Sequence, residues 1–192
     1  MHSQRIFHAV IWFWVILLQT AIEVKCECVN SSAFGLESGL ILDDQLTASS
    51  MWPKAVVSYG RLRWITIPHE RFGFWMPRIS DEQQWVMIDF IAIATIVKIE
   101  TQGRDDGNEW ITSFTLSFGN QRTSLEDFKD SSSGQIKEFS GNHDGNTVVE
   151  NVISPTIVAR YLRINPKTWF GQQALRMELY GCYNSPLNPQ AL

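Results

Sequence analysis

From Leu46 onward the chain is a series of short apolar runs separated by turn-forming residues, and no sustained helical period interrupts it. The pattern is clearest where apolar residues occupy every second position, at Phe114, Leu116 and Phe118 and again within Leu175–Tyr180. A period of two places apolar side chains on one face of a strand. Many short strands at regular spacing therefore predict a single all-β domain, a sandwich or jelly roll.

The remaining runs and turns fit the same fold class. Further strands are expected at Trp85–Phe90, Ile91–Thr101, Val148–Ile153 and Tyr161–Ile164. Turns are expected where Gly, Asn and Asp gather, at Gly103–Asn108, Asp130–Gly134 and Gly141–Asn146, because these residues tolerate turn conformations. Aromatic residues make up 12% of the chain, and their flat side chains favour the half-buried surface of a sheet.

The N-terminal residues predict a secretory signal peptide. A short basic region that contains Arg5 precedes a nearly uninterrupted apolar run, Ile6–Leu18. A dozen or so apolar residues form a signal-peptide core, whereas about 20 are needed to span a bilayer. We expect residues 1–24 to be removed by cleavage between residues 20 and 25, and the mature protein to be soluble and extracellular. The alternative is an uncleaved signal anchor or a buried strand.

Three cysteines follow this segment: Cys26, Cys28 and Cys182. Cys26 and Cys28 are too close for a relaxed bond with each other, so one of them is expected to pair with Cys182. The thiol left over would form a disulfide-linked homo-oligomer, or it would be capped or buried. Asn30 begins the sequon Asn30–Ser32, which predicts N-glycosylation on a surface segment.

Charge and motif content exclude several classes of function. The formal net charge of −4 gives no electrostatic reason to expect a nucleic-acid partner. The chain has no Gly-x-Ser-x-Gly elbow, His-Glu-x-x-His motif or Gly-rich phosphate loop. Only His69 and His143 lie beyond the signal segment, and they are not spaced as a pair of metal ligands. We therefore expect neither an enzyme nor a required cofactor.

An ordered series of motifs gives the chain a resemblance to a known family. In chain order they are Leu36–Gly39, Leu46–Ser50, Gln84–Asp89, Thr101–Arg104, Glu109–Phe114, Phe139–Asn142, Ala159–Pro166 and Leu175–Cys182. The series resembles the discoidin family, also called the coagulation factor V/VIII type C domain, over about residues 28–182. The resemblance implies an eight-stranded jelly-roll β-sandwich of the galactose-binding-like type. Its two ends would be joined by Cys28, or Cys26, and Cys182, with a flexible tail at 183–192.

The resemblance also implies ligand binding through loops at one end of the sandwich. Family members bind anionic phospholipid, collagen, glycans or protein tails in this way, and they are not catalysts. Carried onto this chain, the loops are Met51–Gly60, His69–Trp75 and Gly103–Glu109, with a turn at Trp169–Gly171 beside them. The chain departs from the family pattern at several places. The hairpin at Gly119–Thr123 lacks the family's common Asp-Gly turn, and about two extra residues separate Cys28 from Phe34. The first loop is shorter than in the phospholipid-binding members, which argues against lipid insertion, and the family's acidic-Leu-Gly motif reads Asp89–Phe90–Ile91.

The candidate ligand-binding residues lie on these loops: Trp52, Lys54, Tyr59, His69, Phe72, Arg104, Asp105, Asp106, Glu109 and Trp169. An exposed aromatic beside a cation, as at Trp52 and Lys54, offers flat apolar area at little entropic cost. Alternatively, Trp52 covers the end of the sandwich against Arg61. If exposed, Phe72 and Phe74 could enter a membrane interface, helped by Arg71 and Arg78. In the alternative, Phe74 and Trp75 close the core and only Phe72 is exposed.

The third loop is polar and acidic, which argues against membrane insertion. Its carboxylates could receive a basic group or calcium, but the loop lacks the twelve-residue spacing of a calcium loop, so we expect a turn with a ligand-facing edge and no metal. Elsewhere, Arg160, Arg163, Arg176 and Glu178 alternate along predicted strands and predict a structural network of ion pairs.

The sequence thus predicts a secreted, non-enzymatic adhesion or matrix-binding module. Its expected ligand is an extracellular protein, collagen or a glycan, held by loops at one end of the sandwich. The alternatives are peripheral binding to an anionic phospholipid membrane and a calcium-assisted lectin.

Overall fold

The computed structural model describes Cys28 and residues 30–184. The expected signal peptide, Cys26 and most of the expected tail lie outside the described residues. The described part is an eight-stranded antiparallel sheet with two short 3-10 helices. None of its helices is long and apolar enough to cross a membrane. The prediction of an all-β jelly-roll sandwich is confirmed.

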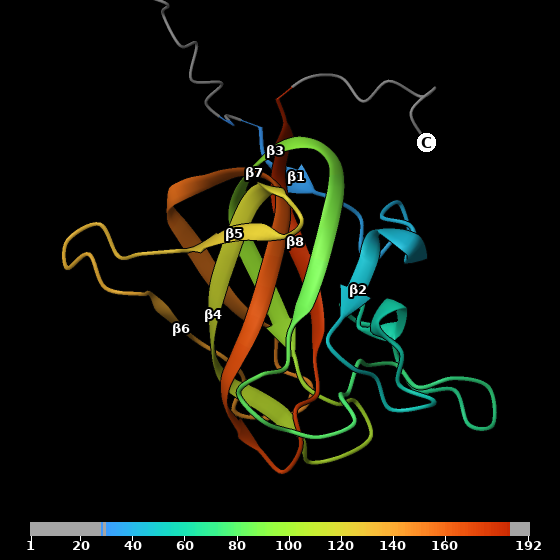
Figure 1. The fold of residues 1–192 in the computed structure, drawn as a ribbon. Helices are drawn as coiled ribbons and strands as arrows, with labels where there is room; N and C mark the ends of the chain where they lie inside the picture. Colours follow the sequence, from blue (N-terminus) through green and yellow to red (C-terminus); the bar gives the residue numbers. More distant parts are fainter. Residues whose placement is uncertain (1–27, 29, 185–192) are drawn as a thin grey trace, which may run out of the picture.

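The strands are β1 (Ser32–Ala33), β2 (Leu46–Ala48), β3 (Val86–Gln102), β4 (Trp110–Gln121), β5 (Ser124–Asp127), β6 (Glu138–Ser140), β7 (Val149–Phe170) and β8 (Arg176–Tyr183). The 3-10 helices are η1 (Asp43–Gln45) and η2 (Val57–Tyr59). Strand order is β1-β8-β3-β7-β4-β5, with β2 paired to β3 and β6 paired to β4. Figure 1 shows the long strands wrapped around a common interior.

The long strands β3 and β7 change partners along their length. The first residues of β3 pair with β2 and with residues 161–164 of β7. After a register shift between Asp89 and Ala94, β3 pairs with β8 and with residues 149–159 of β7. Strands that bend and change partners in this way connect the two layers of a sandwich.

Each of these strands joins two runs that the sequence analysis treated as separate strands. The runs at 85–90 and 91–101 form one strand, β3, and those at 148–153 and 161–164 both lie in β7. The expected boundaries were wrong because irregularities in register bend the strands without ending the pairing.

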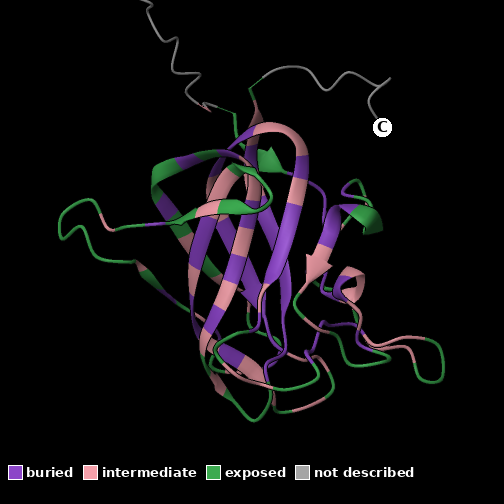
Figure 2. Ribbon diagram, viewed as in Figure 1, coloured by how far each residue is buried: buried purple, intermediate pink, exposed green. Residues whose placement is uncertain are grey.

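The hydrophobic core fills the space between the layers, where the strands are mostly buried (Figure 2). Aromatic pairs lie within it: the ring centroids of Phe34 and Phe90 are 4.7 Å apart, and those of Phe114 and Phe139 are 5.6 Å apart. Each such large apolar side chain contributes about 1.5–3 kcal/mol when fully buried.

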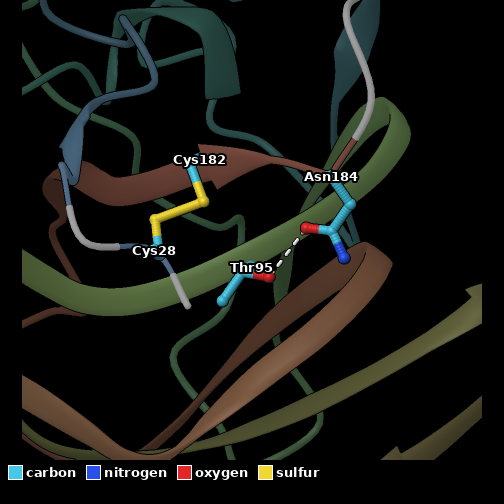
Figure 3. Close-up of a disulfide and its surroundings, with 4 residues drawn as sticks. All are labelled: Cys28, Thr95, Cys182 and Asn184. Atoms are coloured by element: carbon cyan, nitrogen blue, oxygen red, sulfur yellow. Dashed lines mark hydrogen bonds between the residues drawn. A yellow bond between two sulfur atoms is a disulfide. The ribbon is translucent and has the colours of Figure 1, made fainter. Parts of the chain in front are cut away.

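A disulfide joins Cys28 to Cys182, with their Cα atoms 5.8 Å apart (Figure 3). Of the two pairings that the sequence left open, the structure has the one with Cys28. Beside it, the Thr95 hydroxyl donates to Asn184 Oδ1 at 2.7 Å. In Figure 1 this end, with β1 and the end of β8, lies opposite the loop at residues 103–109.

The predicted ion-pair network of Arg160, Arg163, Arg176 and Glu178 was wrong. Arg160 pairs instead with Asp89 through two contacts of 2.8 and 2.9 Å. The Glu178 carboxylate accepts backbone N–H groups of residues 35–37 at 2.9–3.3 Å. Burial is the reason: Arg176 and Glu178 are each about 1% exposed, so each takes its hydrogen bonds from the nearest backbone.

Candidate ligand-binding end of the sandwich

The first loop contains a tight turn, Trp52–Ala55, that is fixed to the sandwich. The Ala55 amide donates to the Trp52 carbonyl at 3.0 Å, and the Trp52 amide donates to the Met76 carbonyl at 2.7 Å. The Trp52 side chain is 50% exposed. Arg61 does not cover it, because that guanidinium is buried against the carbonyls of Leu36 and Ile41. The turn therefore presents Trp52 to solvent.

The second loop is the tip of a hairpin closed between Ile67 and Arg71. The Ile67 amide donates to the Arg71 carbonyl at 2.8 Å, and the reverse bond is 3.1 Å. The tip, residues 68–70, is exposed, and His69 adopts a positive φ of 67°. The hairpin projects from the body of the sandwich at the right of Figure 1, with its exposed tip in green in Figure 2.

Of the two phenylalanines at the base of this hairpin, one is buried in the core and the other is partly exposed. Phe74 is 2% exposed, whereas Phe72 is partly exposed and packs on it with centroids 5.3 Å apart. Gly73 between them has no room for a side chain, since a Cβ there would overlap the backbone of Ile65. The alternative in which Phe74 closes the core and only Phe72 is exposed is confirmed.

The third loop neutralises part of its own negative charge. Arg104 pairs with Asp106 at 2.5 Å and with Glu109 at 3.3 Å, and its guanidinium lies 5.1 Å from the Phe74 ring centroid. The hydrogen bond to Asp106, the largest cause, raises the pKa of Arg104. The acidic edge expected for a basic ligand is thus occupied in part by a cation of the same loop.

Asp105 joins the third loop to the hairpin. Its carboxylate accepts the Thr66 amide at 2.6 Å and the Thr66 hydroxyl at 2.9 Å. The Thr66 hydroxyl oxygen in turn accepts the Gly73 amide at 3.1 Å. Asp105 therefore positions the loops, although the sequence analysis assigned it to the ligand.

Arg176, on β8, also holds these loops in place. Its guanidinium donates to the carbonyls of Gly103 at 2.7 Å, Trp64 at 2.8 Å and Gly145 at 2.6 Å, and to Asn146 Oδ1 at 2.9 Å. Burial lowers the pKa of this guanidinium. One buried side chain thus connects three loops that are far apart in the sequence, which fixes their relative positions.

Two neighbouring hollows open among these loops. The larger, about 480 Å³, is lined by Pro53, Lys54, Val56, Tyr59, Thr66, Ile67, Pro68, His69, Glu70, Arg71, Phe72 and Asp106. The smaller, about 300 Å³, is lined by Trp52, Ala55, Phe72, Phe74, Met76, Arg78, Arg104, Glu109 and Gln172. Phe72 lines both hollows. Volumes of this order are those of small-molecule sites.

The hollows bring together most of the predicted site residues. Lys54, Tyr59, His69, Phe72 and Asp106 line the larger one, and Trp52, Phe72, Arg104 and Glu109 line the smaller one. Trp169 lines neither hollow; its backbone pairs with Ile111 within the sheet.

Nothing in the sequence singled out three further residues that line the hollows: Val56, Ile67 and Gln172. Arg71 and Arg78 also line them; from the sequence they were expected only to help the second loop enter a membrane interface. Within residues 28 and 30–184, no group of three or more His, Cys, Asp or Glu side chains is arranged to hold a metal ion.

Comparisons with known proteins agree with this geometry. Residues 45–179 match the F5/8 type C domain. The chain is 36% identical to retinoschisin of Takifugu rubripes over 166 residues, which cover 82% of this chain and 57% of that protein. It is 32% identical to retinoschisin of Mus musculus over 169 residues, covering 85% and 74%. Coagulation factor V of Bos taurus is 34% identical over 79% of this chain, which is 7% of that protein's length.

Solved structures share the fold. Discoidin II of Dictyostelium discoideum superposes with a TM-score of 0.67 at 26% identity, covering 80% of this chain and 58% of that one. The family 32 carbohydrate-binding module of Clostridium perfringens NanJ, in complex with galactose, gives 0.54 at 15% identity, covering 78% and 98%. The second likeness concerns the fold alone. The chain belongs to the F5/8 type C, or discoidin, domain family, a family of binding modules rather than enzymes.

Proposed function

We propose that the chain is a secreted adhesion or matrix-binding module that takes an extracellular protein or glycan ligand into the hollows beside Phe72. One observation carries the proposal: two adjoining hollows, walled by aromatic and charged side chains, open at the end where three loops are fixed. The relatives named retinoschisin and discoidin II, which share this domain, support a binding role.

The mechanism is passive recognition by a preformed surface. Asp105 and Arg176 hold the loops in place through short hydrogen bonds, so little ordering is needed when the ligand arrives. Trp52 and Phe72 supply apolar contact area, and the charged residues orient the ligand.

The loop tips favour a protein or glycan over a lipid. The hairpin ends in Pro68–Glu70 and the third loop in Asp106–Asn108, and both tips are polar or charged. Peripheral binding to an anionic membrane is the second candidate, because Met51 and Trp52 are exposed and the Arg78 guanidinium lies beside them, donating to the Met51 carbonyl at 3.4 Å. An apolar tip with adjacent cations suits an interface.

The test compares Trp52→Ala with Ile136→Ala. The two side chains are equally exposed, 50% and 51%, and Ile136 lies outside both hollows. Each purified protein is applied to immobilised collagen, a glycan array, and vesicles with and without phosphatidylserine. We expect a collagen or glycan signal that Trp52→Ala weakens about tenfold and Ile136→Ala leaves unchanged. Binding confined to phosphatidylserine vesicles would establish the membrane candidate instead, and equal binding by both variants would refute the loop site.

A further inference from the structure

The two hollows are bordered by cations that the described chain leaves unpaired. Lys54, Arg71 and Arg78 line them, and none of the three forms an ion pair with any carboxylate among the described residues. Arg104, in contrast, is paired twice. Unpaired cations therefore gather at one end of a chain whose formal net charge is −4.

In the lining of the larger hollow, the cations without an ion-pair partner among the described residues outnumber the carboxylates without one, two to one. Lys54 and Arg71 line it together with His69, and two carboxylates, Glu70 and Asp106, face the same space. Asp106 is already paired with Arg104, which leaves Glu70 as the carboxylate without a partner among the described residues. A ligand with a negative group would compensate this excess.

Arg71 is held in place before any ligand binds. Its guanidinium lies 4.3 Å from the Trp64 ring centroid and donates to the Ile65 carbonyl at 3.3 Å. A guanidinium stacked in this way loses little freedom when it pairs with an anion, and its planar donors match carboxylate and sulfate groups.

We propose that the larger hollow binds an anionic saccharide, a sugar unit that carries a sulfate or carboxylate group, as in a sulfated polysaccharide. This inference rests on the proposed function and names the ligand class of the same site. Lys54 and Arg71 bind the anionic group, Glu70 and the Tyr59 hydroxyl accept hydrogen bonds from sugar hydroxyls, and Phe72 packs against the ring.

The chemistry of the hollow favours a saccharide over other anions. The hollow offers two cations and one unpaired carboxylate. A ligand that matches them carries acidic groups for the cations and hydroxyl donors for the carboxylate. A phospholipid surface would present phosphate and carboxylate groups without a ring to enter the hollow, and the exposed hairpin tip beside it is polar. An acidic peptide would leave Glu70 beside its own carboxylates, which costs affinity.

The test uses heparin as the sulfated probe, desulfated heparin and dextran as matched sugars, and polyglutamate and phosphatidylserine vesicles as other anions. Two double variants remove the same charge at different places. Lys54→Gln with Arg71→Gln changes the hollow, whereas Arg122→Gln with Lys129→Gln changes exposed cations that lie outside both hollows. We expect the first pair to weaken heparin binding at least tenfold and the second less than twofold.

Several results would overturn the inference. These are equal losses in the two double variants, tighter binding of polyglutamate or vesicles than of heparin, equal binding of desulfated heparin, and no heparin binding. If the hollow variant retains a Trp52-dependent collagen or neutral-glycan signal at full strength, the ligand class is wrong while the loop site stands. Should that double variant fold poorly, Lys54→Gln alone gives the same comparison. Arg71→Lys, which keeps the charge, is then its control.

Discussion

The Asp105 carboxylate binds both the amide and the hydroxyl of Thr66, at 2.6 and 2.9 Å, and so joins two loops separated by 39 positions. Asp105 itself lines neither hollow. The arrangement of the proposed ligand-binding end therefore depends on a residue that lines neither hollow.

Replacing Asp105 with Ala should loosen the hairpin while the sandwich stays folded. The Thr66 amide loses a charged acceptor, at a cost of about 1–3 kcal/mol in local stability. Hydrogen exchange should show faster exchange confined to residues 66–73, together with weaker ligand binding. Unchanged exchange in this segment would mean that the contact does not hold the hairpin.

Arg176→Met should be far more damaging than Arg163→Met. Arg176 satisfies three backbone carbonyls and one side-chain oxygen, and each buried acceptor left unpaired costs about 1–3 kcal/mol. We expect a loss of at least about 3 kcal/mol in the free energy of unfolding. Arg163 is the matched control, since its Nε has no hydrogen-bond partner in the described chain. Urea denaturation of both variants measures the difference, and similar losses would contradict this role of Arg176.

Ile91→Gly should stabilise the protein. Ile91 has a φ of 66°, a left-handed conformation that costs a β-branched residue about 1–2 kcal/mol. Glycine adopts it freely, but its greater freedom in the unfolded chain offsets about half of the gain. The expected result is a free energy of unfolding about 0.5–1 kcal/mol higher. Ile93→Gly, in the same strand without a positive φ, should destabilise; stabilisation by both changes would exclude this explanation.

Stability should fall in acid through Asp89. Burial raises the pKa of Asp89, but hydrogen bonds from Arg160 and from the Ile91 amide outweigh burial and lower the pKa below its usual value. A lowered pKa in the folded state gives stability that is complete above the unfolded value of about 3.9 and is lost as the pH falls through the folded value.

Unfolding free energies measured at about pH 7, 5 and 3 test this linkage. Asp89→Asn should be less stable than the natural chain at neutral pH and should lose less on acidification. Asp44→Asn, at an exposed position of η1, is the control and should follow the natural profile. If Asp89→Asn follows that profile as well, other carboxylates are responsible for the acid effect.

Local pattern predicted the strands well where it alternates. The runs around Phe114 and Leu179 lie in β4 and β8, because alternating apolar residues give a strand one continuous apolar face. In β8 the opposite face, with Arg176 and Glu178, is buried as well. The local pattern did not predict correctly where the strands end. The residues around Phe90 and Ile91 do not show that one strand continues through the register shift between Asp89 and Ala94, since that continuity depends on the partner strand β7.

The sequence predicted which loops form the candidate site, but it predicted less well what each residue does there. Trp52, Lys54 and Phe72 line the hollows as expected. Asp105 and Arg176 were assigned otherwise, because most of their partners are backbone groups of distant loops, which a one-letter sequence does not display. Similarly, pairing within one loop occupies Asp106 and Glu109 with Arg104, and spacing alone could not distinguish this from a surface open to a ligand.

The Cys28–Cys182 bond and Asn184 lie at the end of the sandwich opposite the third loop (Figures 1 and 3). The first and last described residues thus lie at one end of the sandwich, and the proposed ligand-binding loops lie at the other. A support or partner attached near this disulfide would leave the hollows facing outward. Copies fixed side by side by that end would present a layer of parallel sites, so that a repeating ligand could engage many of them at once and gain avidity without tighter single contacts.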